Sequence, residues 1–300
     1  MIKDIRKLLD FLEANRISFR EDMTGRECTT FKTGGPIPVL SEPRSLNEAS
    51  LLLGFAESND IDFFLIGNGS NLLIPDEGSD RLFIRLSGEL SEYCISENEL
   101  SCGAGASLAA VSKYSVSCGL MGLEWASGIP GTVGGAVAMN ASAYGGEIRS
   151  VLSELTVYSD GEVRTVSAEP DKMGYRTSAY AFPNMVVLKA VFTLEPDDGN
   201  ARERMEQYNQ KRKNSQPLSY PSAGSTFKRP QGYYAGALIE QAGLKGTRVG
   251  GACVSEKHAG FIINDRGASS SDVTALMEIV RNRVMERFGV MLEPEVIVLR

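Results

Sequence analysis

The sequence GLEWASGIPGTVGGAVAMNASAYGG, residues 122–146, decides how the rest of the chain is interpreted. Seven of its 25 residues are glycine, and it contains no Lys, Arg or His. Glycine is costly where nothing requires it, so this density predicts sharp turns or a close approach of backbone to a bulky group. Successive glycine amides also form concave nests that bind phosphate oxygens without a cationic side chain. A run of tight structural turns is the alternative, and this stretch alone leaves both open.

Bulk composition predicts a globular chain of about two domains. The 300 residues are 42% hydrophobic and 23% charged, which is ordinary for a folded protein. The net charge of −7 and the pI of about 5.1 argue against general nucleic-acid binding, which needs a basic surface. A local basic pocket for an anionic small molecule stays open.

The N-terminal segment, residues 1–16, does not have the form of a secretory signal, because charges interrupt it throughout. Its apolar residues fall at helical spacing and predict an amphipathic helix. These residues are Ile2, Ile5, Leu8, Leu9 and Leu12. No stretch of about 18 apolar residues occurs, so we expect a cytoplasmic protein with no membrane attachment.

The cysteine and histidine content limits the chemistry that the chain can perform. The five cysteines are odd in number and include no C-x-x-C pair, which predicts buried free thiols and neither a disulfide framework nor a metal site. His258 is the only histidine. This excludes sites that need two histidines, and any Ser-His or Cys-His scheme would have to use position 258.

Alternating short strands and helices predict an α+β chain in three parts, 1–87, 88–197 and 198–300. Ser45 and Glu48 are placed as a capping box at the start of a helix over 45–60. Asp160-Gly161 is the expected turn of a hairpin within 150–168. The segment 199–214 is highly charged, lacks an apolar face and predicts an exposed linking helix.

Two further glycine motifs fail the tests for known nucleotide-binding loops. GNGSNLL at 67–73 lacks the third glycine of a dinucleotide fingerprint and is followed by strand-like residues, and GAGASLAAV at 103–111 also lacks that glycine. No P-loop sequence occurs. The loops at 67–71, 103–107 and 128–135 nevertheless all join plausible strands, so together they fit one long cleft for a diphosphate dinucleotide. Three unrelated strand turns are the alternative.

Six ordered runs resemble the UDP-N-acetylenolpyruvoylglucosamine reductase family, and they extend over nearly the whole chain. The runs are IGNGSNLL (66–73), GLEWASGIPGTVGGAVAMNASAYGGE (122–147), YRTSAY (175–180), PSAGSTFKRP (221–230), LIEQAGLKG (238–246) and LEPEV (292–296). The interval from Arg176 to Ser225 is short, as in the family's second type. The resemblance therefore implies that the extra loop of the first type, with its closing tyrosine, is missing.

The resemblance implies an FAD-binding fold of the vanillyl-alcohol-oxidase/PCMH type in two α+β subdomains, followed by a C-terminal α+β substrate-binding domain. It also implies FAD, NADPH as hydride donor, and UDP-N-acetylglucosamine enolpyruvate as the substrate reduced to UDP-N-acetylmuramate for peptidoglycan precursors. Because His258 is far in sequence from the glycine loops, we expect FAD to be bound non-covalently. No nucleic acid, membrane or obligatory protein partner is expected. Another FAD-dependent oxidoreductase of the same fold, acting on a small alcohol or sugar, is the alternative.

Three residues match the family's catalytic positions. The implied reaction transfers hydride from flavin N5 to C3 of the enolpyruvyl group and leaves a carbanion at C2 that needs a proton. Ser225 matches the proton donor, and a hydroxyl can protonate so strong a base. Arg176 matches the residue that binds the substrate carboxylate. Glu295 matches the third position, and its pKa is expected to rise in the complex. A turn serine, a surface arginine and a strand-entry glutamate are the structural alternatives.

The resemblance also suggests contacts for the cofactor and the substrate. The FAD set consists of two glycine-lined walls and two weaker candidates: Gly67, Asn68, Gly69, Ser70, Asn71, Ile129, Pro130, Gly131, Thr132, Gly134, Gly135, Asn140 and Tyr144. The substrate set contains Tyr175, Lys228, Arg229, Lys211 and Arg212, the last two in a cluster with Lys213. Arg229 stands where a common family form has Asn, which leaves the base contact open. A solvated helix end, where cations suit the dipole, is the alternative for 211–213.

Overall fold

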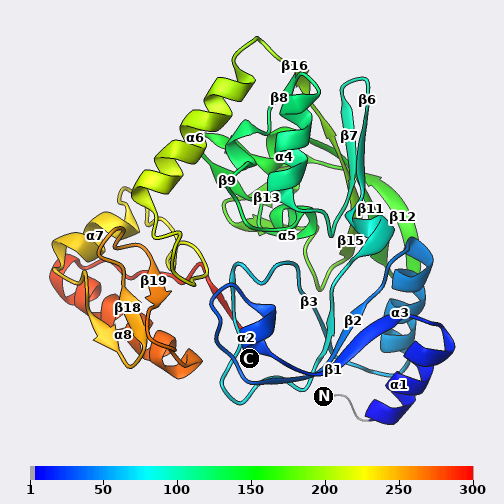
Figure 1. Ribbon diagram of the computed structural model, residues 1–300, viewed down its shortest axis with the longest axis horizontal. Helices are drawn as coiled ribbons and strands as arrows, with labels where there is room; N and C mark the ends of the chain where they lie inside the picture. Colours follow the sequence, from blue (N-terminus) through cyan, green and yellow to red (C-terminus); the bar gives the residue numbers. More distant parts are fainter. Residues whose placement is uncertain (1–3, 300) are drawn as a thin grey trace. The chain divides into compact units, whose positions relative to one another are not determined.

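The computed structural model describes residues 4–299, and its chain divides into two compact units (Figure 1). Unit 1 comprises Met1–Glu21, Val39–Gly67 and Arg81–Lys211, and unit 2 comprises Asp22–Pro38, Asn68–Asp80 and Arg212–Arg300. Two N-terminal segments thus belong to the same unit as the C-terminal part of the chain. The expected three-part division at residues 87 and 198 stays a prediction about subdomains.

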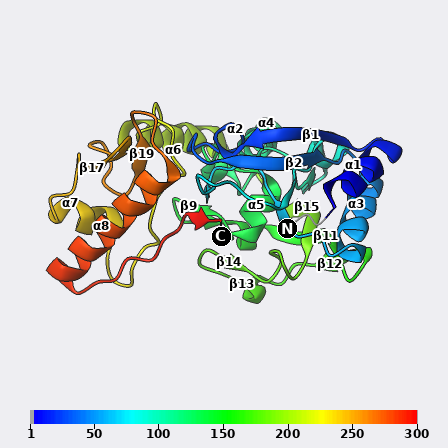
Figure 2. The ribbon, with the colours of Figure 1, turned by 90° about the horizontal axis from the view of Figure 1, so that it is seen from below.

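The first part of unit 1 packs two helices against a small sheet. The strands β1 (Ser18–Thr24), β2 (Pro36–Glu42), β5 (Leu82–Ile84) and β3 (Phe63–Leu65) form this sheet in that order, and β5 pairs in parallel with both β2 and β3. The helices α1 (Ile5–Ala14) and α3 (Leu46–Ser58) lie side by side in both ribbon views (Figures 1 and 2), where Phe11 stacks on Phe55 at 3.9 Å between ring centroids.

The predicted N-terminal helices are confirmed, with one change at a cap. Leu8 and Leu12 of α1 are buried, as its spacing predicts, whereas Ile2 lies outside the described residues. Ser45 caps α3 by accepting a hydrogen bond from the Glu48 amide at 3.2 Å. The Glu48 carboxylate accepts from the amide of Arg44 at 2.8 Å. The reciprocal bond of the expected capping box is therefore made one residue earlier than the cap.

The second part of unit 1 is built on a five-stranded antiparallel sheet with its own hydrophobic core. The strands in spatial order are β12 (Glu162–Ser167), β11 (Leu152–Ser159), β15 (Val186–Thr193), β7 (Glu99–Gly103) and β6 (Tyr93–Ser96). Asp160 and Gly161 have φ values of +54° and +80°, as the tight primed turn of a two-residue hairpin requires. The predicted hairpin is confirmed. The helices α4 (Leu108–Ser117) and α5 (Val133–Ala138) contribute to the core beside this sheet.

Unit 2 contains the C-terminal elements. A small sheet of β17 (Arg248–Val249), β18 (Ala252–Val254) and β19 (Ile262–Asn264) packs with α7 (Ala235–Gln241) and α8 (Ser270–Phe288). A parallel pair joins β4 (Leu72–Leu73) to β20 (Ile297–Val298). Phe31 and Leu73 belong to the same core as the C-terminal helices, which explains why their segments belong to this unit.

The remaining elements are short, apart from one long charged helix. The helix α6 (Ala201–Ser215) has Ala201 as its buried residue, so the predicted exposed helix is confirmed. The short elements are α2 (Gly25–Cys28), η1 (Gly88–Ser91), β8 (Leu120–Met121), η2 (Glu124–Ala126), β9 (Ser142–Ala143), β10 (Gly146–Glu147), η3 (Ile148–Ser150), η4 (Pro170–Lys172), β13 (Met173–Gly174), β14 (Thr177–Ser178) and β16 (Glu195–Pro196).

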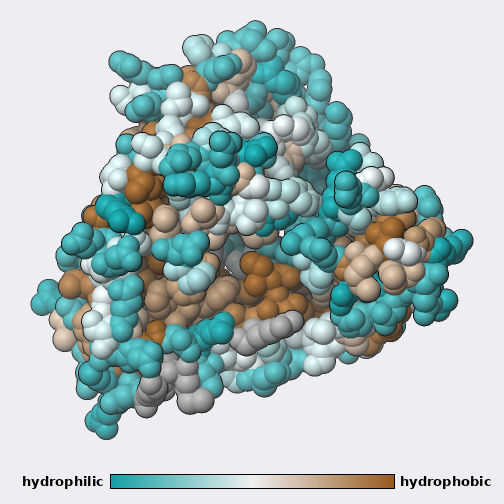
Figure 3. Space-filling view, turned by 180° about the vertical axis from the view of Figure 1, so that it is seen from behind, coloured by the Kyte–Doolittle hydropathy of each residue, from teal (hydrophilic) through white to brown (hydrophobic). Residues whose placement is uncertain are grey.

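The cysteines are free thiols, as predicted, but they differ in exposure. All five cysteines are free, but Cys94 and Cys118 are exposed, so their predicted burial is wrong: one lies on the edge strand β6 and the other at the end of α4. Residues 4–299 hold no cluster of three potential metal ligands and no helix that is long and apolar enough to cross a membrane. Hydrophilic residues cover most of the face shown in Figure 3.

Candidate functional site

Two of the glycine-lined loops are joined through their backbones within unit 1. The Leu108 amide donates to the Gly131 carbonyl at 3.0 Å, and the Val133 amide donates to the Ala106 carbonyl at 2.9 Å. Between these bonds, Ser107 and Thr132 form an isolated antiparallel bridge. The loops at 103–107 and 128–135, predicted to share a cleft, therefore form one continuous wall.

Glycine is needed in this wall because protein segments approach each other closely. A Cβ atom on Gly67 would collide with Thr132 Oγ1, so the end of the 67–71 loop that belongs to unit 1 also packs against this wall. A Cβ on Gly134 would lie 3.0 Å from the Cβ of Ala104. Close approach thus accounts for part of the glycine content, and the approaching group at these two positions is the protein itself.

A short helix inside the glycine stretch escaped the sequence analysis. Thr132 caps the helix α5 by accepting a hydrogen bond from the Gly135 amide at 3.3 Å. A threonine before a small apolar run is a helix-start signal. The two glycines that follow have low helix propensity and concealed that signal.

The cofactor-loop residues 68–71 belong to unit 2 and are tied to neighbouring segments there. The carbonyl of Gly69, whose φ is +60°, accepts a hydrogen bond from the Thr30 amide at 3.2 Å. Thr30 Oγ1 then donates to the Ser222 carbonyl at 2.7 Å. Asn71 Nδ2 donates to the Glu295 carbonyl at 3.1 Å. The loop is therefore fastened to the segments that carry both Ser225 and Glu295, and nothing local in the sequence of Thr30 marks its part in this.

The structure brings the segments of Ser225 and Glu295 together. The Glu295 amide donates to the Thr226 carbonyl at 2.9 Å, and Phe227 and Pro294 form an isolated bridge. Thr226 is buried, and its hydroxyl accepts a hydrogen bond from the Ile262 amide at 3.0 Å. Ser225 itself is exposed. An accessible hydroxyl next to a rigid anchor is suited to proton transfer to a bound molecule.

Arg176 lies in unit 1, at the turn of the hairpin formed by β13 and β14. Its backbone has a φ of +55°, a left-handed conformation that costs a non-glycine residue about 1 kcal/mol or more. Its Nη1 donates to Ser142 Oγ at 3.0 Å, and its guanidinium lies 5.3 Å from the centre of the Tyr175 ring. The hydrogen bond to Ser142 holds the Arg176 side chain against β9.

The two weaker cofactor candidates have different surroundings. Asn140 is buried, and its Nδ2 donates to Glu147 Oε2 at 3.1 Å and to the Gly174 carbonyl at 3.0 Å. Both of its amide hydrogens are thus used by the protein. Tyr144 is 41% exposed and stacks on Tyr208 of α6 at 4.6 Å between ring centroids. Of the two, only Tyr144 presents a surface to an incoming molecule.

The cationic candidates for the substrate lie on two segments. Lys228 Nζ is 3.4 Å from Glu293 Oε2, and the Arg229 guanidinium stacks 4.0 Å from the centre of the Tyr234 ring. Lys211 lies 5.9 Å from the ring of Tyr208 near the C-terminal end of α6, as the helix dipole favours. Arg212 and Lys213 follow it on the same helix.

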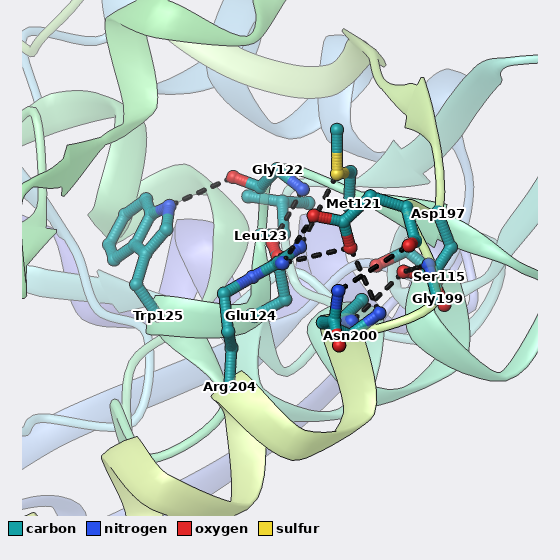
Figure 4. Close-up of polar contacts among 12 residues, drawn as sticks. Ser115, Met121, Gly122, Leu123, Glu124, Trp125, Asp197, Gly199, Asn200 and Arg204 are labelled. Carbon is teal, nitrogen blue, oxygen red and sulfur yellow. Dashed lines mark hydrogen bonds and ion pairs between the residues drawn. The ribbon is translucent and has the colours of Figure 1, made fainter.

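An ion pair that the sequence analysis missed fastens α6 within unit 1. Arg204 Nη2 donates to Glu124 Oε1 at 2.7 Å (Figure 4). Arg204 Nη1 donates to Asp198 Oδ2 at 2.7 Å. The Glu124 side chain is 8% exposed, and its Oε2 accepts a hydrogen bond from the Gly122 amide. Glu124 therefore anchors the start of the glycine stretch, although 80 residues of chain separate it from Arg204.

A second carboxylate, in unit 2, fastens the segment that follows the 68–71 loop. Asp76 accepts hydrogen bonds from the amides of Ser270 at 2.7 Å and Ser271 at 2.8 Å, at the start of α8. The Ser271 hydroxyl adds a third bond at 2.7 Å. Burial raises the pKa of Asp76, but these hydrogen bonds outweigh it and the net pKa is lowered.

His258 is held within unit 2 by packing. Its Nδ1 accepts a hydrogen bond from the Gly260 amide at 3.1 Å, and a Cβ on Gly236 would lie 3.2 Å from its Cε1. Burial lowers the pKa of His258. A neutral imidazole in this position fits a structural role.

Two family models match separate parts of the chain. One, described as an FAD binding domain, matches residues 37–167, and the other, described as the C-terminal domain of UDP-N-acetylenolpyruvoylglucosamine reductase, matches residues 216–299. The loops at 67–71, 103–107 and 128–135 lie within the first match, and Ser225 and Glu295 lie within the second. The predicted class, an FAD-binding fold followed by a C-terminal α+β domain, is confirmed.

Full-length relatives agree with these matches. The chain is 42% identical over 297 residues to UDP-N-acetylenolpyruvoylglucosamine reductase of Clostridium tetani, covering 98% of this chain and 96% of the relative. It is 44% identical to the enzyme of the same name from Caldanaerobacter subterraneus subsp. tengcongensis, covering 97% and 96%. The crystal structure of the Thermus caldophilus enzyme superimposes with a TM-score of 0.81 at 34% identity, covering 95% of this chain and 99% of that chain.

Proposed function

The chain belongs to the UDP-N-acetylenolpyruvoylglucosamine reductase family, and we propose that it reduces UDP-N-acetylglucosamine enolpyruvate to UDP-N-acetylmuramate with FAD and NADPH. The observation that carries the proposal is the pairing of the Ser225 and Glu295 segments, with Asn71 bonded to Glu295. The proposed substrate is therefore a small UDP-sugar, and the proposed product is a peptidoglycan precursor. We propose the cytoplasm as the location of the reaction.

The described residues fit a flavin nucleotide. The segments 103–107 and 128–135 consist mainly of glycine and other small residues, so a bulky diphosphate could approach their backbone closely. In the second segment, Ile129, Pro130, Gly131 and Thr132 precede α5, and the loop 67–71 would supply the remaining contacts. These loops would hold FAD, and the bound cofactor would supply hydride transfer from NADPH to the substrate. The packed, neutral His258 supports non-covalent binding.

Ser225 is proposed to deliver the proton to C2 of the reduced substrate. Its exposure gives the hydroxyl access to a bound molecule, and the buried Thr226 beside it keeps the segment in place. A positioned proton donor of this kind contributes roughly 10²–10⁴-fold to a rate.

Arg176 and Glu295 are proposed to stabilise the negative charge that develops on the substrate carboxylate. Arg176 would bind the carboxylate through its planar guanidinium, and its strained backbone supports a functional role for the turn. Glu295 would act in its protonated form as a hydrogen-bond donor, which requires a raised pKa in the complex.

The substrate contacts are proposed from charge and exposure. Lys228 and Arg229 lie three and four residues after Ser225 and would bind the UDP moiety, and the stacked Arg229–Tyr234 pair offers a flat cationic surface. Tyr175, Lys211 and Arg212 are the further candidates.

A half-reaction experiment tests the proposal. In Ser225→Ala, flavin reduction by NADPH should be retained, whereas turnover of the UDP-enolpyruvyl sugar should fall by roughly 10²-fold or more. Ser222→Ala is the matched control on the same segment and should keep both half-reactions. If Ser225→Ala leaves both half-reactions at the wild-type rate, its assigned role is wrong. If the purified protein neither contains flavin nor takes it up, the proposed function is wrong as a whole.

A further inference from the structure

The SAGS segment, residues 222–225, lies between two backbone hydrogen bonds within unit 2. Before the segment, the Pro221 carbonyl accepts from the backbone amide of Asn264 at 2.9 Å. After it, the Thr226 amide donates to the Gly260 carbonyl at 2.9 Å. The four residues between these two points belong to no helix or strand. The contacts that hold them therefore decide where the hydroxyl of the last serine lies.

Within the described part of the chain, one hydrogen bond reaches the SAGS segment between these two points. The hydroxyl of Thr30 donates to the Ser222 carbonyl at 2.7 Å, the usual length of a good bond between two oxygens. Ala223 is buried in the core of unit 2 and adds packing. Gly224 has a φ of +76°, and glycine adopts other backbone conformations at little cost. The bond from Thr30 therefore restricts a segment that would otherwise have only Ala223 to hold it.

Thr30 also contacts the cofactor loop 68–71, but it does so mainly through its backbone. Its amide donates to the Gly69 carbonyl at 3.2 Å. Its hydroxyl lies 3.4 Å from the same carbonyl and 2.7 Å from the Ser222 carbonyl. Because a hydroxyl has one hydrogen to donate, the nearer acceptor receives it. Replacement of the hydroxyl therefore removes the bond to the SAGS segment and keeps the backbone bond to the cofactor loop.

We propose that Thr30 is a positioning residue for proton transfer to the substrate, an inference that rests on the proposed function. Its hydroxyl holds the Ser222 carbonyl, and this contact keeps the Ser225 hydroxyl in the orientation that protonation of C2 requires. A misplacement of about 1 Å at a reacting group can lower a rate by roughly 10²-fold. Loss of one hydrogen bond, in a segment that Ala223 also holds, should lower the rate by about tenfold.

Kinetics of the full-length, FAD-loaded protein test the inference. Thr30→Val keeps the branched side chain without its hydroxyl, so kcat for the UDP-enolpyruvyl sugar should fall about tenfold with little change in KM. Flavin reduction by NADPH should stay at the wild-type rate. The solvent deuterium isotope effect on kcat should rise, because the slowed proton transfer then limits turnover more strongly. Thr30→Ser restores the hydroxyl and should restore kcat, whereas Thr30→Ala lacks it and should behave as Thr30→Val does.

A double variant separates positioning of Ser225 from a general effect on the protein. If Thr30 acts through the Ser225 hydroxyl, its removal has nothing left to misplace once that hydroxyl is gone. Thr30→Val combined with Ser225→Ala should therefore turn over the sugar no more slowly than Ser225→Ala alone. Two losses that multiply would overturn the inference.

Thr29→Val is the matched control on the neighbouring residue. The Thr29 hydroxyl donates to the Gly25 carbonyl at 2.9 Å and does not contact the SAGS segment. This variant should keep the wild-type kcat and isotope effect, whatever its melting temperature. Equal kcat in wild type and Thr30→Val, or an equal loss in Thr29→Val, would show that Thr30 has only a structural role. Failure of wild type to turn over the sugar would instead overturn the proposed function.

Discussion

Glu124 in unit 1 and Asp76 in unit 2 both fasten a segment next to a candidate cofactor loop, but they do so differently. Glu124 is 8% exposed in its side chain and pairs with the charged side chain of Arg204. Asp76 accepts its bonds from the amides and hydroxyl at the start of α8. The first contact depends on a second charge far along the chain, whereas the second depends on a helix end.

The two contacts should therefore respond differently to mutation and to a change in pH. Removal of one member of a buried ion pair leaves the other charge uncompensated, which costs more than loss of a helix cap. A carboxylate that caps a helix loses its value when it is protonated. Mutation of the Glu124–Arg204 pair should therefore lower the free energy of unfolding more than mutation of Asp76. The free energy of unfolding should also depend on pH through the protonation of Asp76.

The largest effect is expected for Glu124→Ala. The change removes one of the two carboxylates, Glu124 and Asp198, that bind the Arg204 guanidinium. Because this charge then loses a partly buried partner, we expect the free energy of unfolding to fall by about 2–4 kcal/mol. Urea unfolding followed by circular dichroism measures it. The control is Glu169→Ala, which breaks an exposed pair with Lys172 and should leave the curve unchanged. If Glu124→Ala and Glu169→Ala have the same urea unfolding curve, the Glu124–Arg204 pair stabilises the protein no more than an exposed ion pair does.

A smaller loss is expected for Asp76→Ala. Ser269 stays in place as the N-cap residue of α8, but the amides of Ser270 and Ser271 lose the Asp76 carboxylate, at a cost of about 1–2 kcal/mol. The same urea experiment measures it. Glu77→Ala is the neighbouring control, since both side chains are exposed but the hydrogen bonds at the start of α8 are made to Asp76. A loss for Asp76→Ala as large as that for Glu124→Ala would contradict the proposed order.

The pH dependence of stability should reveal the Asp76 cap. Its pKa is lowered in the folded chain from the usual 3.8, so its contribution is fully present above that value and is lost as pH falls through the folded pKa. The stability difference between wild type and Asp76→Asn should therefore stay constant from pH 7 to about 5 and shrink below about 4. Unfolding free energies across this range measure it. A difference that grows on acidification would reverse the assigned sign.

The smallest effects are expected for the adjacent glycines of α5. A Cβ on Gly134 would lie 3.1 Å from the Ala104 carbonyl oxygen, so Gly134→Ala should cost about 1 kcal/mol. A Cβ on Gly135 meets Thr132 Oγ1 at 3.4 Å, and Gly135→Ala should be neutral or stabilise by about 0.5 kcal/mol. Thermal unfolding of the flavin-free protein compares them. Equal destabilisation by both variants would contradict the difference in free space at the two positions.

Local patterns in the sequence were sufficient for most of the elements. The hairpin turn at Asp160-Gly161, the cap at Ser45 and the charged helix at 199–214 all depend on residues within a few positions of one another. The same patterns failed at α5, because glycine propensity opposed the cap signal of Thr132. They also missed the exposure of Cys94, which depends on β6 being an edge strand.

The candidate site was only partly predictable for the same reason. Motif order identified the segments of Ser225 and Glu295, and the structure pairs them through Thr226. Asn140 was identified by its motif as well, but its amide hydrogens are both used by protein acceptors. Whether a polar side chain is free for a ligand depends on neighbours that the sequence does not display.

By itself, the sequence determined most of the longer helices and strands, the glycine-lined loops and the family to which the chain belongs. Backbone preferences and motif spacing act over short distances, so they can be recognised without the fold. Only the tertiary structure decided that residues 22–38 and 68–80 belong to unit 2 and that Glu124 pairs with Arg204. These features depend on burial and on contacts between distant segments, which chain packing alone creates.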